Sequence, residues 1–101
     1  MEDILIKVHE SYRWVVAVCD KEIYGKKLQE GKRVLDLSTN FFKGKEFSLE
    51  EAKEEILRCI GEDATFNFVG ENSINLAKEI GIAKDEGISK IENIPFALVL
   101  L

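Results

Sequence analysis

The sequence predicts an α+β fold, in which a mostly antiparallel sheet of five to six strands carries two helices packed on one face. Three observations lead to this prediction. β-Prone runs are grouped early in the chain, two amphipathic helical patterns with start and stop signals come later, and two further β-prone runs close the chain. Strands and helices that are segregated in this way are typical of α+β domains.

The first two predicted strands form a hairpin. Apolar and polar residues alternate over residues 4–8, which indicates a strand with one wet face. The run over 14–19 is continuously apolar, which suits a strand covered on both faces. A turn at residues 11–12 would place His9 opposite Trp14.

The next part of the chain is predicted to be mostly loop. Residues 21–32 contain two glycines and many polar side chains, so we expect a loop with one helical turn. Residues 33–37 are predicted as the third strand, and residues 40–45 as a second loop that carries two exposed aromatic rings. Residues 64–68 are predicted as the fourth strand.

A capping box marks the start of the first helix. The Ser48 hydroxyl can accept a hydrogen bond from the Glu51 amide, while the Glu51 carboxylate reaches back to the amide of Ser48. The apolar residues that follow fall on one helical face: Leu49, Ala52, Ile56, Leu57 and Ile60. Gly61 is predicted to end this helix in a left-handed conformation.

The stretch NFVGENS joins the fourth strand directly to the second helix. Backbone amides at a helix start attract anions, but this stretch lacks a glycine-rich phosphate motif, and Glu71 places a negative charge where a phosphate would sit. We therefore interpret it as a helix start, with Asn67 as the N-cap and Gly70 allowing close packing against the sheet.

The remaining elements follow from similar signals. The second helix has its apolar side between Val69 and Ile80, and Gly81 followed by Ile82 predicts a Schellman ending. Residues 87–91 are predicted as a short strand, and residues 93–95 as a bend. The final run, 96–101, is apolar to its last residue, so it is either a central strand or part of a subunit contact.

The length, hydropathy and net charge of the chain narrow the class of protein. A chain of 101 residues makes a single domain, 1–101. No apolar run approaches the roughly 20 residues that span a bilayer, and the acidic, strand-like start is unlike a signal peptide, so we expect a cytoplasmic protein without a membrane partner. The net charge of −5 argues against a general nucleic-acid binder.

Four stretches together resemble a known family: VVAVCDKEIYGKKLQEG, FFKGKEFS, NFVGENSINLAKEIG and IPFALVLL. They are similar to the archaeal family known as domain of unknown function 424, over nearly the whole chain. The resemblance implies a small archaeal cytoplasmic protein without an established activity, for which a link to translation or RNA has been suggested. Members often have a histidine after the proline of the closing strand. This sequence has Phe96 there, so no imidazole is carried over.

One segment of this acidic chain is basic. Between Lys21 and Lys45, seven basic residues face three acidic ones, a surplus of four positive charges. Cations beside aromatic rings are what single-stranded RNA binding uses. The leading hypothesis is a non-enzymatic binding module for RNA or a ribonucleoprotein. Its candidate residues are Tyr24, Lys26, Lys27, Lys32, Arg33, Phe41, Phe42, Lys43 and Lys45. The alternative interpretation is a solvated loop face with the phenylalanines tucked beneath it.

Two other hypotheses stay open. The apolar C-terminal strand could serve a protein–protein contact, including a homodimer, because an exposed strand edge invites pairing. An enzyme could instead use a pocket formed by a separate set of residues: Cys19, Asp20, Asn67, Gly70 and Glu71.

The sequence gives little sign of the catalytic groups that such a pocket needs. His9 is the one histidine, and a hairpin would hold it far from Cys19, which disfavours a cysteine–histidine pair. Asp20 is predicted to cap the loop near Ile23. Two separate cysteines and one histidine show no ligand spacing for zinc, so no metal site or cofactor is predicted.

Overall fold

The computed structural model describes residues 3–101. Its elements in chain order are β1 (Ile4–His9), β2 (Val15–Asp20), the short 3-10 helix η1 (Lys21–Ile23), β3 (Lys27–Glu30), β4 (Arg33–Asp36), β5 (Lys45–Phe47), α1 (Leu49–Ile60), β6 (Thr65–Val69), α2 (Glu71–Ile80), the 3-10 helix η2 (Asp85–Gly87), β7 (Ser89–Ile91) and β8 (Ile94–Val99).

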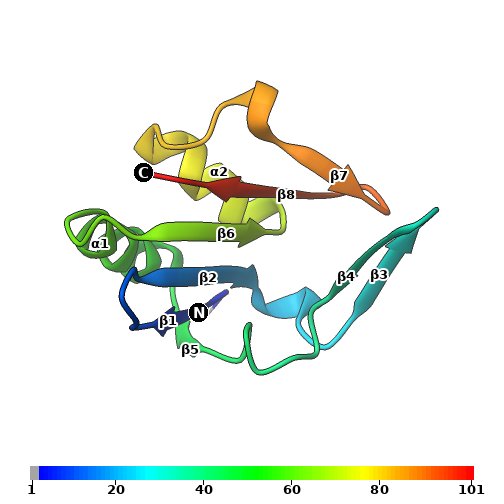
Figure 1. Cartoon of the computed structure of the whole chain (residues 1–101), viewed down its shortest axis with the longest axis horizontal. Helices are drawn as coiled ribbons and strands as arrows, with labels where there is room; N and C mark the ends of the chain where they lie inside the picture. The colour runs from blue at the N-terminus through cyan, green and yellow to red at the C-terminus, as the bar shows by residue number, and fades with distance from the viewer. Residues whose placement is uncertain (1–2) are drawn as a thin grey trace.

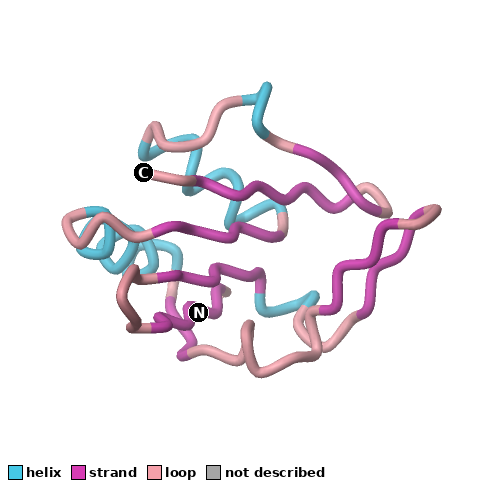
Figure 2. The backbone as a smooth tube through the Cα atoms, viewed as in Figure 1, coloured by secondary structure: helices cyan, strands magenta, loops and turns pink. Residues whose placement is uncertain are grey.

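The described residues form one six-stranded sheet, in the order β5-β1-β2-β6-β8-β7, and a separate two-stranded sheet of β3 and β4 (Figure 1). The larger sheet is mixed, because β2 and β6 run parallel while its other neighbouring strands are antiparallel. Figure 2 shows the helical segments beside the strands, and the longest of them are α1 and α2. The predicted α+β class with a mostly antiparallel sheet is therefore confirmed.

The β1–β2 hairpin forms with a register one residue away from the prediction. His9 lies opposite Val15 instead of Trp14, and Leu5 lies opposite Cys19. A four-residue separation along β2 places Cys19 about 13 Å from the position opposite His9, at the usual rise of a strand. Cys19 and His9 are therefore not neighbours on the sheet.

The segment predicted as a loop over 21–32 contains a strand. The expected helical turn is present as η1, but β3 follows it and pairs with β4 in an antiparallel hairpin. Leu28 is the one buried residue of β3, so this strand lacks the apolar alternation by which a half-buried strand is recognised. Figure 1 shows this hairpin projecting beside the larger sheet.

Two buried clusters hold the molecule together. The first contains side chains of both helices, including Ile56 and Ala77, with strand residues such as Val18 and Phe68. The second contains the following buried residues: Ala17, Cys19, Ile23, Leu28, Leu37, Phe42, Val69 and Ile91. Because Leu28 belongs to the second cluster, the β3–β4 hairpin is held by apolar packing as well as by its own pairing.

The helix α1 has the predicted capping box. The Glu51 amide donates to Ser48 Oγ at 3.2 Å, and the Ser48 amide donates to Glu51 Oε1 at 3.0 Å. Its end differs from the prediction, since Gly61 is right-handed and the positive φ falls at Asp63. Leu57, predicted on the apolar face, is 48% exposed, because the buried face of α1 runs through Ala52, Ile56 and Cys59.

The helix α2 ends as predicted but begins differently. Gly81 is left-handed, and the Ile82 amide donates to the Ala77 carbonyl at 3.0 Å, which completes the Schellman ending. The N-cap is Gly70, whereas Asn67 lies inside β6, so the prediction that Asn67 caps this helix is wrong.

The closing strand is internal to the sheet. A two-residue turn at Glu92 and Asn93, both with positive φ, joins β7 to β8. The bend predicted over 93–95 is therefore part of a hairpin, and β8 begins at Ile94. Since β8 lies between β6 and β7, the edge strands of the larger sheet are β5 and β7.

Candidate functional site

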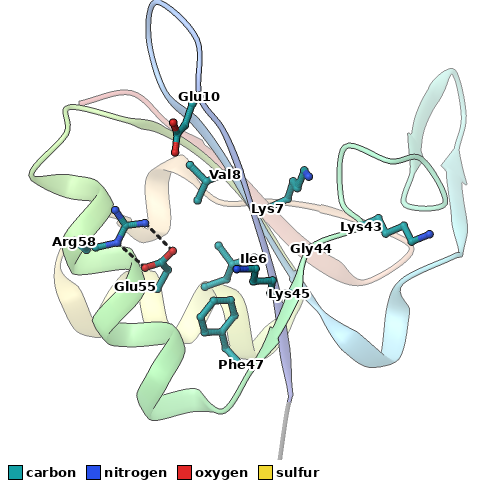
Figure 3. Close-up of a pocket in the computed structure, with 10 residues that line it drawn as sticks. All are labelled: Ile6, Lys7, Val8, Glu10, Lys43, Gly44, Lys45, Phe47, Glu55 and Arg58. Carbon is teal, nitrogen blue, oxygen red and sulfur yellow. Dashed lines mark hydrogen bonds and ion pairs between the residues drawn. The ribbon is translucent and has the colours of Figure 1, made fainter.

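A groove of about 590 Å³ lies at the edge of the sheet where β1, the 43–44 loop, β5 and α1 meet (Figure 3). We call it the basic groove. Its lining residues are Ile6, Lys7, Val8, Glu10, Lys43, Gly44, Lys45, Phe47, Glu55 and Arg58. They include four cations and two carboxylates, so the groove carries a surplus of two positive charges on a chain whose net charge is −5.

The groove exists because β5 covers only part of β1. Ile4 to Ile6 pair with β5, whereas the rest of β1 has no partner strand on that side. The chain approaches β1 very closely at Gly44. A Cβ atom at Gly44 would lie 2.6 Å from the Lys7 nitrogen and closer still to the Ile6 carbonyl, so only glycine fits without a shift.

Arg58 is the fixed cation of the groove. Its Nε donates to Glu55 Oε1 at 2.8 Å, and its Nη2 donates to Glu55 Oε2 at 2.9 Å. The guanidinium also lies 5.7 Å from the centroid of the Trp14 ring. The hydrogen bonds from Arg58 hold the pKa of the Glu55 carboxyl below its usual range. Arg58 and Glu55 thus largely neutralise each other.

Of the three lysines of the groove, Lys45 acts electrostatically on the Glu55 carboxyl and helps to lower its pKa. Lys7, Lys43 and Lys45 are exposed, and none of them forms an ion pair with another residue in the described part of the chain. Figure 3 shows Lys7 and Lys43 pointing away from α1, on the side of β1 opposite to the Arg58–Glu55 pair. The ammonium groups of Lys7 and Lys43 are therefore the free cations of the site.

Two stacked rings lie beside the groove. The rings of His9 and Phe41 are stacked at 4.6 Å with an interplanar angle of 10°, and His9 Nε2 is 3.0 Å from the Phe41 carbonyl oxygen. Phe42 packs its edge against Phe41 at 5.0 Å. His9 lies two residues after Lys7 on β1, and Phe41 lies two residues before Lys43. Aromatic and cationic groups are therefore neighbours here.

The structure divides the basic residues that the sequence singled out. Lys43 and Lys45 line the groove, whereas the others lie on or next to the β3–β4 hairpin: Lys26, Lys27, Lys32 and Arg33. Arg33 donates to Glu30 Oε2 at 3.0 Å and to the Lys90 carbonyl at 2.7 Å. These hydrogen bonds of Arg33 therefore help to hold the hairpin beside the β7–β8 turn.

The aromatic residues of that set also differ from one another. Phe42 was predicted to offer a stacking face, but it is only 6% exposed, because it packs with Leu37 and Cys19 in the second cluster. Tyr24 and Phe41 are half-buried against the same cluster. Phe41 is therefore the ring of this loop that keeps exposed surface next to a free lysine.

Sequence reasoning missed Lys7 and Arg58. Lys7 carries one available signal, because it lies on the wet face of an alternating strand, between two apolar residues. Arg58 gives no such signal, since an arginine next to Glu55 at helical spacing reads as a solvent-exposed pair. Their proximity to Lys43 and Lys45 depends on contacts between elements that are far apart in the chain.

Asp20, one of the residues proposed for a pocket, forms a saturated polar contact instead. The carboxylate of Asp20, 2% exposed, accepts hydrogen bonds from the Asn72 amide at 3.0 Å, the Ser73 amide at 2.8 Å and the Ser73 hydroxyl at 2.7 Å. We call Asp20, Gly70, Asn72 and Ser73 the Asp20 junction. Asp20 caps α2, so the prediction that it caps the loop near Ile23 is wrong.

The other members of the proposed pocket have separate surroundings. Cys19 is fully buried, and desolvation, with the nearby charge of Asp20, raises the pKa of its thiol to about 12. Asn67 lies in β6 opposite Ala17, and Glu71 is exposed at the start of α2. The Cys19 thiol donates to the Asp20 carbonyl at 3.3 Å, and the Asp20 carboxylate lies against Gly70. Because the pKa of the buried thiol is raised, a thiolate nucleophile is disfavoured here.

Two further features concern the described residues as a whole. Within residues 3–101, no group of three or more His, Cys, Asp and Glu side chains is placed to hold a metal ion. No helix in this part of the chain is both long enough and apolar enough to cross a membrane.

Comparison with known proteins identifies the family. The sequence profile of a family described as "Protein of unknown function (DUF424)" matches residues 8–101. The chain belongs to this family. The resemblance drawn from the sequence motifs is thereby confirmed for DUF424. Among proteins with curated descriptions, none matches the chain.

A solved structure shares the fold of this DUF424 chain. It is an uncharacterized conserved protein from Methanopyrus kandleri, which is 24% identical, with a TM-score of 0.84. The similarity covers 96% of this chain and 91% of that one. At this identity the likeness supports the fold and carries no information about activity.

Proposed function

We propose that this DUF424 protein is a cytoplasmic, translation-associated binding module for RNA, free or within a ribonucleoprotein, and that it binds through the basic groove. The observation that carries the proposal is a groove lined by Lys7, Lys43 and Lys45, of which Lys7 and Lys43 have no partner among the described residues. These three lysines come from two separate segments, β1 and residues 43–45, of a chain whose net charge is −5. A phosphodiester backbone is the polyanion that such a set fits.

The expected binding is modest and depends strongly on salt. If each of the three lysines neutralises one phosphate of a single strand, the affinity falls roughly 20-fold between about 50 mM and about 200 mM salt. The Arg58–Glu55 pair adds little to this dependence, because the guanidinium already has a carboxylate partner. The negative remainder of the chain keeps nonspecific binding weak.

A fluorescence anisotropy titration with short mixed-sequence RNA at these two salt concentrations tests the proposal. The double variant Lys7→Glu/Lys43→Glu should lose at least tenfold in affinity at low salt. The matched control is Lys26→Glu/Lys32→Glu, which changes the same net charge on the β3–β4 side of the molecule and should lose less than twofold. Equal losses in both variants would show that binding follows net charge and not the groove.

Self-association through the C-terminal strand is the second candidate. Leu98, Leu100 and Leu101 are 60%, 70% and 42% exposed, which is unusual for three leucines so close together at the end of a chain. Sedimentation velocity over a range of concentrations tests this role. A dimer that dissociates in the variant Leu98→Lys/Leu100→Lys would support it, and a monomer at all concentrations would exclude it.

A further inference from the structure

We infer that the basic groove takes a single RNA strand and not a duplex, and that an unpaired base lies on the sheet next to the groove. This inference rests on the proposed function. The surface concerned is one half of a sheet face, which we call the open sheet face: Lys7, His9, Val15, Thr65, Asn67 and Leu98.

The strand register places these residues together. Lys7 lies opposite Ala17, Ala17 lies opposite Asn67, and Asn67 lies opposite Leu98, so the four form one row across β1, β2, β6 and β8. His9, Val15 and Thr65 form the next row in the same way. Directly opposed residues project on the same side of a sheet. Lys7 therefore belongs to the open sheet face and to the basic groove at once.

Burial shows where this face is covered. The neighbouring row includes Leu5 and Cys19, which are both buried, and Cys19 belongs to the second cluster together with Leu28 of the β3–β4 hairpin. In the open rows Ala17 is buried, whereas Val15, Thr65 and Asn67 are half-buried and Leu98 is 60% exposed. The sheet thus keeps an uncovered area directly beside the free lysines.

Asn67 makes this area suitable for a base. Its side-chain amide forms no hydrogen bond with any other residue between 3 and 101, although it lies half-buried on the sheet. An amide presents a donor and an acceptor side by side, and this pattern matches the hydrogen-bonding edge of a nucleobase. That edge is accessible only when the base is unpaired.

The aromatic rings and the lysines beside the open sheet face also favour an unpaired base. The His9–Phe41 stack borders the same rows, and base stacking on aromatic rings needs a base that has left its own helix. Lys7 and Lys43 point to the side of β1 away from α1 (Figure 3), where they can neutralise the phosphate of the same nucleotide. The volume of about 590 Å³ is that of a small-ligand site, which suits a nucleotide better than a duplex.

The test compares one RNA sequence in two forms. Fluorescence anisotropy at low salt should show that the single strand binds at least tenfold more tightly than its duplex. Asn67→Ala and Phe41→Leu should each weaken binding of the single strand about five- to tenfold and leave binding of the duplex unchanged. The matched control is Asn75→Ala, an exposed asparagine on α2, which should leave both unchanged. Circular dichroism melting confirms that each variant is folded.

The outcomes separate this inference from the proposal beneath it. Equal affinity for single strand and duplex, with loss of both in Lys7→Glu/Lys43→Glu, would overturn the single-strand inference and leave RNA binding by the groove in place. An unchanged affinity of folded Asn67→Ala for the single strand would remove the base from the open sheet face. If neither form of RNA binds at low salt, both proposals fall.

Discussion

The Asp20 junction and the basic groove are built from similar groups, but their charged side chains have different surroundings. Each combines charged side chains with a glycine at which two segments approach very closely, Gly70 in the junction and Gly44 in the groove. In the junction the charge is buried, and its oxygens accept three hydrogen bonds from the chain itself. In the groove the charges of Lys7 and Lys43 are exposed without a partner in residues 3–101.

This contrast separates polar groups that stabilise the fold from polar groups that are available for binding. A buried carboxylate is tolerated only when its lone pairs are satisfied, so Asp20 has no capacity left for a ligand. An exposed lysine keeps its hydration and contributes little to stability, so its position is free to be set by a binding role. Stability and binding should therefore respond to changes at different sites.

The largest effect is expected at Asp20. Asp20→Ala leaves two amides and one hydroxyl without their acceptor in a buried site, so we expect a loss of about 3–5 kcal/mol in the free energy of unfolding. Urea denaturation followed by circular dichroism measures it. Asp36→Ala is the control, because Asp36 also accepts from an amide and a hydroxyl, both of Ser38, but at an exposed turn. Similar losses at both positions would contradict the distinction.

Gly70→Ala should rank second. Gly70 has a φ of 109°, and a Cβ atom there would lie 2.6 Å from Asp20 Oδ2. We expect a loss of about 2–3 kcal/mol in unfolding free energy from strain and clash together. Gly81→Ala separates the two causes, since Gly81 has a φ of 96° and open space around it, and should cost only about 1 kcal/mol. Thermal and urea unfolding of both variants tests this ranking.

Ser48→Ala should come third, at about 1 kcal/mol, because it removes one half of the capping box of α1. The hydrogen bonds from Ser48 lower the pKa of the Glu51 carboxyl in the folded protein. A lowered folded pKa means that this contribution is present above the ordinary glutamate pKa of about 4.3 and is lost as the pH falls through the folded pKa.

The pH dependence supplies the check on the cap. Stability curves of the natural sequence and of Glu51→Gln, measured by urea unfolding from neutral to acid pH, should converge as Glu51 becomes protonated, because the Ser48 amide that lowers its pKa is present in both. A gap of constant size down to the acid end would show that the Glu51 carboxylate takes no part in the cap. The affinity for RNA at neutral pH should be the same in both proteins.

The smallest effect on stability is expected in the groove itself. Lys7→Glu/Lys43→Glu should change the unfolding free energy by no more than about 0.5 kcal/mol, because neither lysine has an ion-pair partner to lose among residues 3–101. The same variant should show the greatest loss in RNA affinity. A marked destabilisation, measured by urea unfolding, would mean that these lysines serve the fold, and the contrast with the Asp20 junction would break down.

Local signals in the sequence were read correctly where the structure is itself local. The capping box at Ser48 and the left-handed Gly81 each depend on residues within one or two helical turns, so their spacing is sufficient to predict them. The α+β class follows from the order of such segments. The strand β3 escaped prediction because only Leu28 of its four residues is buried, and the layer that buries Leu28 comes from distant parts of the chain.

The candidate site was even harder to predict from the sequence, because its residues come from distant segments. Lys43 and Lys45 were predicted as cations for binding, but their partners in the groove, Lys7 and Arg58, come from segments that meet only in the folded chain. Phe42 looked available for stacking and is buried, because the second cluster closes over it. Asn67 looked like a helix cap, while the N-cap position is Gly70 and the carboxylate that accepts from the first amides of α2 belongs to Asp20, 53 residues away from Ser73.

Short-range patterns in the sequence were enough for the α+β class, the capping box of α1, the Schellman ending of α2 and the family, since these depend on periodicity, capping and motif spacing over short distances. Only the tertiary structure decided which charged residues are satisfied internally and which remain free. The physical reason is that burial and hydrogen-bond satisfaction belong to pairs of distant segments. The carboxylate of Asp20 and the ammonium groups of Lys7 and Lys43 acquire their different roles from what the fold places beside them.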